Sequence, residues 1–318
     1  MTVLSRREWL LTSALAVGGG ASCLGSSARA SNLAANRVAP GATFTYCMNT
    51  STISGQKLSI VEEIDIIARA GYDGIEPWIR ELDQYVKDGG SLVDLGKKLS
   101  DSGLKVVDAI GFFEWAVDDP ARRKKGLEEA RRNMEMVQTI GGTRIAAPPF
   151  GATDQVDLDL RKVADRYRDL LEISERYGVT PLVEVWGFSK PISRLGEAAL
   201  VTIESGHPKA AILADVYHLH KGGSDYGGLH LLGPDAIPVL HMNDFPDLPR
   251  EKLSDSDRVY PGDGVAPLKE LFLTFKRLGF HLNLSLELFN RDYWKQDPAK
   301  VAATGLAKMK AAVDSAIL

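Results

Sequence analysis

Four ionisable residues stand inside or at the end of four successive apolar runs in the second half of the chain. The runs read PLVEVW, AILAD, PVLHM and LSLEL, and they contain Glu184, Asp215, His241 and Glu287. Singly, such a carboxylate is often solvated and such a histidine is often structural. Three carboxylates gathered without a cation would repel one another and be forced to take up protons. A divalent ion removes that cost, and a mixed carboxylate–imidazole donor set suits Mn²⁺, Mg²⁺ or Co²⁺.

The elements that must position these residues follow one repeating pattern. Short β-rich runs alternate eight times with segments whose apolar residues recur every three or four positions. We expect strands at 44–49, 74–78, 105–111, 144–149, 180–186, 210–216, 237–243 and 282–289. We expect helices at Ile60–Ala70, Leu92–Ser102, Arg122–Ile140, Leu160–Tyr177, Leu195–Glu204, Leu229–Leu232, Leu268–Leu278 and Ala299–Ile317.

Eight such alternations with apolar strands indicate a parallel sheet covered by helices, and eight strands close a barrel. The sequence therefore predicts a single-domain (β/α)₈ TIM barrel over residues 43–318. A doubly wound open sheet is the competing fold, but no glycine-rich phosphate fingerprint follows the first strand. In a TIM barrel the carboxyl ends of the strands form the active-site rim, so the four ionisable residues are expected to meet there.

The N-terminal residues read as an export signal. Arg6 and Arg7 precede a short apolar run, and an Ala28-Arg29-Ala30 cleavage site follows. This order predicts a twin-arginine signal peptide over residues 1–30 and a linker over 31–42, with an ordinary secretory signal or a lipid anchor at Cys23 as alternatives. The apolar run is too short for a permanent membrane span. The mature protein is therefore expected in the periplasm or outside the cell, with no stable membrane anchor.

The charge of the chain bears on its partners. The formal net charge is −4, and loss of three arginines and Glu8 with residues 1–30 would leave about −6. An acidic balance argues against nucleic acid or an anionic membrane as partner. Only Cys47 would remain after cleavage, so no internal disulfide is expected. Homo-oligomer formation is left open.

The motifs around the four residues resemble those of the xylose-isomerase-like sugar isomerase/epimerase superfamily, which includes hydroxypyruvate isomerase, ketose 3-epimerases, inosose dehydratases and apurinic endonucleases. The resemblance covers residues 44–317 and rests on Glu184, Asp215-x-x-His218, His241-Met-Asn-Asp244 and Ser285-Leu-Glu287. It implies that Glu184 and Glu287 are both metal ligands and proton carriers on opposite sides of the substrate. It also implies that His218 hydrogen-bonds a substrate oxygen.

Further substrate contacts are expected from the same resemblance. Arg250 is similar to the family's arginine that binds a substrate hydroxyl or carbonyl, with Arg258 as its competitor. Glu76 ends the second expected strand, where substrate contact and structural pairing are both open. Lys190 stands where some relatives carry an acidic residue, and it either polarises a carbonyl or is a surface charge.

Aromatic residues follow several of the expected strand ends. They are Trp78, Phe112, Trp115, Trp186 and Phe245. Such side chains either stack on a sugar ring or pack as a cap over the barrel mouth. Trp186, two residues after Glu184, is the one expected to bind substrate.

These features predict a metal-dependent isomerase or epimerase of a non-phosphorylated carbohydrate, acting through an enediolate. A lyase of the same fold is the alternative, by inosose-type dehydration or by elimination from a 3-keto-glycoside. A non-catalytic sugar-binding barrel is a third possibility. An apurinic endonuclease is disfavoured, because no histidine stands in the third expected strand and no Asp-x-His follows His241.

Overall fold

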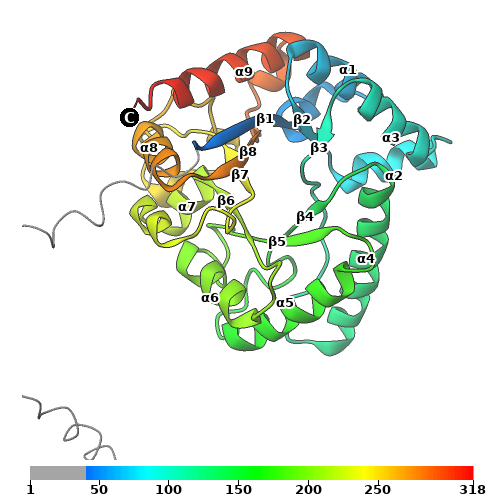
Figure 1. Ribbon diagram of the computed structural model, residues 1–318, viewed down its shortest axis with the longest axis vertical. Coiled ribbons are helices and arrows are strands. Elements are labelled where there is room, and N and C mark those ends of the chain that lie inside the picture. Colours follow the sequence, from blue (N-terminus) through cyan, green and yellow to red (C-terminus); the bar gives the residue numbers. More distant parts are fainter. Residues whose placement is uncertain (1–40, 318) are drawn as a thin grey trace, which may run out of the picture. The chain divides into compact units, whose positions relative to one another are not determined.

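The computed structural model describes residues 41–317, and the expected signal peptide and nearly all of the linker lie outside them. Eight parallel strands form one sheet, in the order β3-β2-β1-β8-β7-β6-β5-β4. Figure 1 shows these strands as a central ring with the helices around it. The strands are β1 Thr43–Asn49, β2 Gly74–Glu76, β3 Lys105–Val106, β4 Arg144–Ala147, β5 Thr180–Glu184, β6 Ile212–Asp215, β7 Val239–Met242 and β8 His281–Leu286. The predicted single-domain TIM barrel is confirmed.

The outer layer is made of helices that mostly coincide with the predicted ones. The α-helices are α1 Ile60–Ala70, α2 Ile79–Lys87, α3 Leu92–Asp101, α4 Pro120–Thr139, α5 Leu160–Ser174, α6 Leu195–Ser205, α7 Val216–Gly222, α8 Leu268–Leu278 and α9 Pro298–Asp314. Short 3₁₀ helices are η2 Thr50–Gln56, η3 Tyr226–Leu231, η4 Arg250–Lys252, η5 Asp255–Asp257 and η6 Tyr293–Lys295. Helices α2 and α7 were not predicted, because each is shorter than the roughly 11 residues over which a helical period can be recognised.

Local sequence signals explain where the helices begin and end. Ser59 and Glu62 form a capping box at the start of α1, which pairs backbone N–H groups that the helix leaves free. Gly71 and Gly279 end α1 and α8 in the left-handed conformation, which costs glycine nothing. These stops return the chain to the barrel within a few residues.

The strand register sets the positions of the site residues. The β6–β7 ladder pairs Asp215 with His241, and the β7–β8 ladder pairs His241 with Ser285. On the other side of the barrel, β1–β2 pairs Asn49 with Glu76. Polar side chains from five strands therefore reach the same end of an otherwise apolar core.

Strands β3 and β4 are joined more weakly than the other neighbours. Strand β3 pairs with β2 over two residues. Between β3 and β4 the described residues form no ladder, and one backbone bond, from Ala146 N–H to the carbonyl of Ala109, closes the ring. We call this junction the β3–β4 seam.

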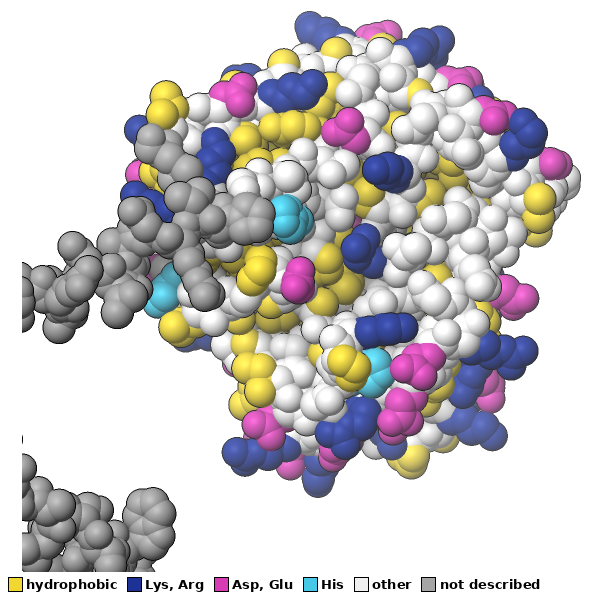
Figure 2. Space-filling view, viewed as in Figure 1, with side chains coloured by type: hydrophobic (Ala, Val, Ile, Leu, Met, Phe, Trp, Pro, Cys, Tyr) yellow, Lys and Arg dark blue, Asp and Glu magenta, His cyan; other side chains and the backbone are white. Residues whose placement is uncertain are grey.

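The surface carries charges of both signs. Figure 2 shows Lys and Arg side chains spread over the face in view, with Asp and Glu among them. Within residues 41–317, no helix combines the length and the apolarity that a membrane crossing requires.

Candidate metal centre

The four residues singled out in the sequence meet at the carboxyl end of the barrel. Glu184 ends β5, Asp215 ends β6, His241 lies in β7, and Glu287 directly follows β8. All four are buried. From Nδ1 of His241 the distances are 3.1 Å to Oε2 of Glu287, 3.5 Å to Oδ2 of Asp215 and 3.8 Å to Oε1 of Glu184.

This arrangement fits a divalent cation. Asp215, His241 and Glu287 each offer a ligand atom, and these atoms lie within 4.8 Å of one another. The Nδ1 atom of His241 is buried and has no hydrogen-bond partner among the described residues. A buried nitrogen without a partner costs free energy unless something binds it. Surrounded by three carboxylates, it is the expected position of a metal ligand, with Glu184 as the fourth donor.

A further carboxylate, that of Glu76, contacts the opposite ring nitrogen of His241. Oε1 of Glu76 lies 3.0 Å from Nε2 of His241, while Oε2 accepts hydrogen bonds from Asn49 Nδ2 at 2.8 Å and Ser285 Oγ at 2.6 Å. Burial opposes the charge on Glu76, but the attraction of His241 and these bonds outweigh it and lower the pKa of its carboxyl. A carboxylate on one ring nitrogen fixes the tautomer that leaves the other free for metal.

Of the two roles that the sequence left open for Glu76, substrate contact and structural pairing, the structure favours pairing. It is fully buried, does not line the cavity above the metal centre, and pairs with His241. Asn49 connects it to the centre, because its Nδ2 also lies 3.2 Å from Oε1 of Glu287.

Asp108 is a buried acid that sequence reasoning missed. It follows β3, and neither of its carboxyl oxygens has a partner among the described residues. Burial and the nearby charge of Glu76 raise the pKa of Asp108 well above its usual range. Its position inside the apolar run Val106-Val107-Asp108-Ala109-Ile110 was the available signal.

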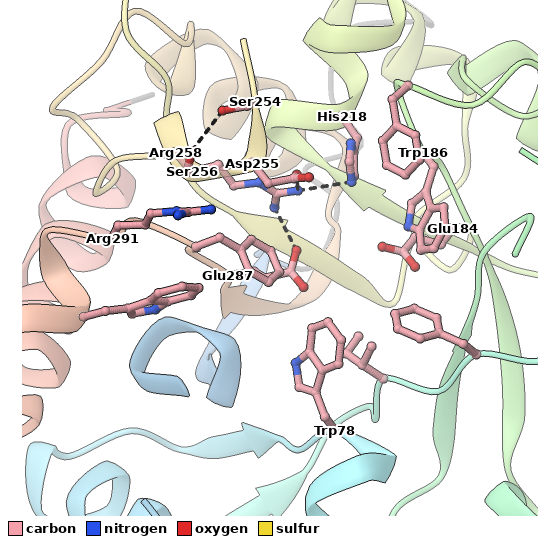
Figure 3. Close-up of a pocket in the computed structure, with 15 residues that line it drawn as sticks. Trp78, Glu184, Trp186, His218, Ser254, Asp255, Ser256, Arg258, Glu287 and Arg291 are labelled. Carbon is pink, nitrogen blue, oxygen red and sulfur yellow. Dashed lines mark hydrogen bonds and ion pairs between the residues drawn. The ribbon is translucent and has the colours of Figure 1, made fainter. Parts of the chain in front are cut away.

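Arg258 joins the metal ligands to the substrate side of the site. Its Nη1 lies 2.8 Å from both Asp215 Oδ2 and Glu287 Oε2, and its Nη2 lies 2.7 Å from Asp255 Oδ1 and 3.1 Å from His218 Nε2. Figure 3 shows Arg258, Glu287 and His218 facing one cavity with Glu184. Because a guanidinium only donates, Nε2 of His218 accepts this bond, and the ring proton then lies on Nδ1, so the 3.3 Å contact of Nδ1 with the Gly187 N–H is not a hydrogen bond.

The arginine beside the cavity is Arg258 and not Arg250, which the sequence analysis had favoured for substrate binding. Arg250 lies in η4, exposed and away from the cavity lining. The chain after β7 runs outward through η4 and returns through an antiparallel bridge between Asp244 and Val259, which brings residue 258 over the barrel mouth. Asp244 fixes the return by accepting bonds from the backbone of Gly262 and Gly264.

Burial shifts the acidity of two groups in the cavity. It raises the pKa of Glu184 to about 8, with repulsion from Glu287 adding to it and His241 opposing it. It lowers the pKa of His218 to about 4, against the attraction of Asp215. Burial also opposes the charge of Asp215, but Arg258 outweighs it and lowers the pKa of that carboxyl. His218 is therefore neutral at pH 7 and is able to accept from Arg258.

The cavity above the metal centre has a volume of about 450 Å³. Its lining includes Glu184, His218, Arg258 and Glu287, and also Trp186, as the sequence predicts. Lys190 does not reach it: the side chain is exposed, and the backbone N–H is bound to the carbonyl of Thr153.

The aromatic candidates separate into two groups. Trp78, Phe112 and Trp186 line the cavity. Trp115 and Phe245 do not, because they are buried in the core beside Tyr167 and His220. Lining residues that sequence reasoning missed include Phe188, Phe289, Arg291 and Trp294.

Comparison with known proteins agrees with the TIM-barrel fold. The family model described as "Xylose isomerase-like TIM barrel" matches residues 64–312. An inosose isomerase of Bacillus velezensis is 28% identical over 280 residues, which cover 84% of this chain and 96% of the relative.

Solved structures share the fold. The IOLI protein with a binding zinc atom superposes with a TM-score of 0.79 at 24% identity, covering 86% of this chain and 99% of that one. The 3-keto-D-glucoside 4-epimerase of E. coli gives a TM-score of 0.67 at 20% identity, covering 85% and 100%.

Proposed function

The chain belongs to the xylose isomerase-like TIM barrel family, and we propose that it is a divalent-metal-dependent isomerase or epimerase of a non-phosphorylated sugar or keto-sugar. The observation that carries the proposal is the unpartnered Nδ1 of His241 among three buried carboxylates. The similarity to inosose isomerase supports a cyclic polyhydroxy ketone as the type of substrate.

Four side chains would hold the cation: Glu184, Asp215, His241 and Glu287. When bound, a divalent cation neutralises the negative charge that develops on a substrate's adjacent oxygens during proton abstraction. Mn²⁺, Mg²⁺ and Co²⁺ match the carboxylate-rich donors, and the zinc in the IOLI structure adds Zn²⁺ to the metals worth testing.

Side chains of the protein would carry out proton transfer and bind the substrate. Glu184 removes or returns the proton at carbon, since its carboxyl group lines the cavity beside the metal centre. Glu287 carries the proton on the opposite side. His218 lines the cavity where substrate would lie, with Nε2 held by Arg258 and Nδ1 beside the Gly187 backbone, and it would have to exchange the Arg258 contact for a substrate oxygen; Trp186 closes that side of the cavity.

The test is hydrogen–deuterium exchange at carbon in D₂O. Purified protein loaded with Mn²⁺ is incubated with ketoses, inososes and 3-keto-glycosides, and exchange next to the carbonyl is followed by NMR. We expect exchange with at least one substrate class. We expect none in Glu184→Gln or Glu287→Gln, because an amide neither takes up nor releases a proton at neutral pH. Exchange at the wild-type rate in both variants overturns the proposal. Release of water or an aglycone in place of an isomer would identify the lyase alternative.

A further inference from the structure

An aromatic belt lines one part of the cavity and continues through Phe150 beyond it. We define it as Trp78, Phe112, Phe150, Trp186, Phe188 and Phe289, which follow five different strands. Their rings touch in series, with centroid distances of 6.1 Å for Phe289–Trp78, 5.5 Å for Trp78–Phe112, 5.3 Å for Phe112–Phe150, 5.6 Å for Phe112–Trp186 and 5.1 Å for Trp186–Phe188. Distances in this range are those of edge-on and offset-stacked rings.

The outer end of the belt is open to water. Phe150 is 37% exposed and Phe188 is 49% exposed, and every other phenylalanine between residues 41 and 317 is better covered. Exposed apolar side chains scattered singly need no explanation, but a contiguous patch at the rim of a cavity is typical of a ligand-binding surface. Both exposed phenylalanines belong to the belt, so its outer rings are free to cover a ligand.

Polar and apolar groups occupy different parts of this cavity. The ionisable groups Glu184, His218, Asp255, Arg258 and Glu287 gather beside the metal centre (Figure 3). The phenylalanines of the belt offer ring faces and no hydrogen-bonding group. The hydroxyls of a sugar ring would therefore find partners near the metal, whereas a group lying against Phe112 and Phe150 would meet apolar surface, with Phe188 between the two parts because its ring lies 5.7 Å from that of His218.

The size of the cavity agrees with a two-part ligand. About 450 Å³ lies within the roughly 300–1,000 Å³ of pockets that enclose drug-sized ligands. One sugar ring occupies the polar part and leaves the belt uncovered.

We propose that the substrates are keto-glycosides with an aromatic aglycone, the keto-sugar ring at the metal centre and the aryl ring against the outer belt. This inference rests on the proposed function, because it assigns the hydroxy-ketone end of the ligand to the metal centre. A second sugar ring could also stack on the belt through its C–H face, but an aryl ring buries more apolar surface against phenylalanine and is therefore the favoured occupant.

Binding tests the inference without turnover. Titration calorimetry on the Mn²⁺-loaded protein compares phenyl β-D-glucopyranoside, methyl β-D-glucopyranoside and cellobiose, none of which carries the ketone. We expect the phenyl glycoside to bind at least tenfold more tightly than the methyl glycoside. Phe188→Ala should remove most of this preference. The matched control is Ile203→Ala, an exposed apolar residue of α6 outside the cavity, which should keep it.

The outcomes separate this inference from the proposed function. Equal binding of the phenyl and methyl glycosides, or a preference unchanged by Phe188→Ala, overturns the aryl subsite. Cellobiose binding as tightly as the phenyl glycoside overturns it in favour of a second sugar. Deuterium exchange on phenyl and methyl 3-keto-glucosides then completes the comparison. Exchange at equal rates on both contradicts the aryl preference while the enzyme activity stands, and a phenyl preference without any exchange contradicts only the proposed function.

Discussion

Replacing Glu76 by glutamine tests how the carboxylate behind His241 controls the metal centre. The variant keeps the shape of the side chain and removes its charge. Oε2 of Glu76 accepts from Asn49 and Ser285. Asn49 cannot reverse its amide, because its Oδ1 already accepts from Ser51 N–H at 2.9 Å and Trp78 Nε1 at 2.8 Å. The new amide must therefore turn its oxygen toward Asn49.

The –NH₂ of the variant side chain then faces Nε2 of His241 and donates to it. A ring that accepts at Nε2 carries its proton on Nδ1, which is the nitrogen that faces the three carboxylates. Metal binding must first reverse this tautomer. Loss of an outer-shell partner of this kind weakens metal affinity about 10–100-fold, and the forced tautomer places our expectation near 100-fold, about 2.7 kcal/mol.

The assay is titration of metal-free protein with Mn²⁺, with free Mn²⁺ followed by electron paramagnetic resonance. Nitrogen-15 NMR of labelled histidine adds a readout that a loss of folding would not mimic: wild-type protein loaded with diamagnetic Zn²⁺ should carry the proton on Nε2, and the metal-free variant should carry it on Nδ1. Glu197→Gln is the control, since Glu197 caps α6 through the backbone of Ser193 and Arg194, away from the site. A Glu76→Gln dissociation constant within twofold of wild type refutes the reasoning.

Three further outcomes are expected. Burial and repulsion from Glu81 raise the pKa of Glu63 to about 10, against an ordinary 4.5. The protonated Glu63 therefore contributes fully to stability below pH 4.5, and this contribution is lost as pH rises toward 10. Tm should fall between pH 6 and 9 in wild type and should fall less in Glu63→Gln. Equal slopes of Tm against pH in the two proteins would contradict this. Arg258→Met removes the partner of two buried carboxylates, Asp215 and Glu287, and of the partly exposed Asp255, and should cost metal-free protein about 3–5 kcal/mol in urea unfolding, a loss that Mn²⁺ partly restores. If residues 1–30 direct twin-arginine export, mass spectrometry of exported protein should find Ser31 at the N-terminus, and replacing Arg6 and Arg7 by lysine should stop export; a secretory route would tolerate the change.

The barrel and the meeting of the metal-ligand candidates were accessible from the sequence, because both depend on periodic patterns. Parallel strands place their carboxyl ends on one rim, so residue type and position in each apolar run were enough to bring Glu184, Asp215, His241 and Glu287 together. That a cation binds there stays a prediction until metal is measured.

The choice between Arg250 and Arg258 was not accessible in this way. It depends on where a loop without periodicity turns back, and that is set by the bridge of Asp244 with Val259, a contact across 15 positions. The role of Glu76 depended on a partner 165 positions away. Sequence spacing carries no information about either contact.

The β3–β4 seam has a consequence for the dynamics of the barrel. Regions with few backbone hydrogen bonds open locally at lower free energy than the rest of a domain, and amide exchange with solvent reveals them. The amide of Ala146, which makes the one backbone bond across the seam among the described residues, should therefore exchange faster than the ladder amides of β7. Phe112 and Phe150 follow the two strands on either side of that junction. If the aryl group of a ligand lies there, as proposed, local opening of the barrel would occur beneath it, and that side of the pocket could adjust to ligands of different width while the β6–β7 and β7–β8 ladders stay closed.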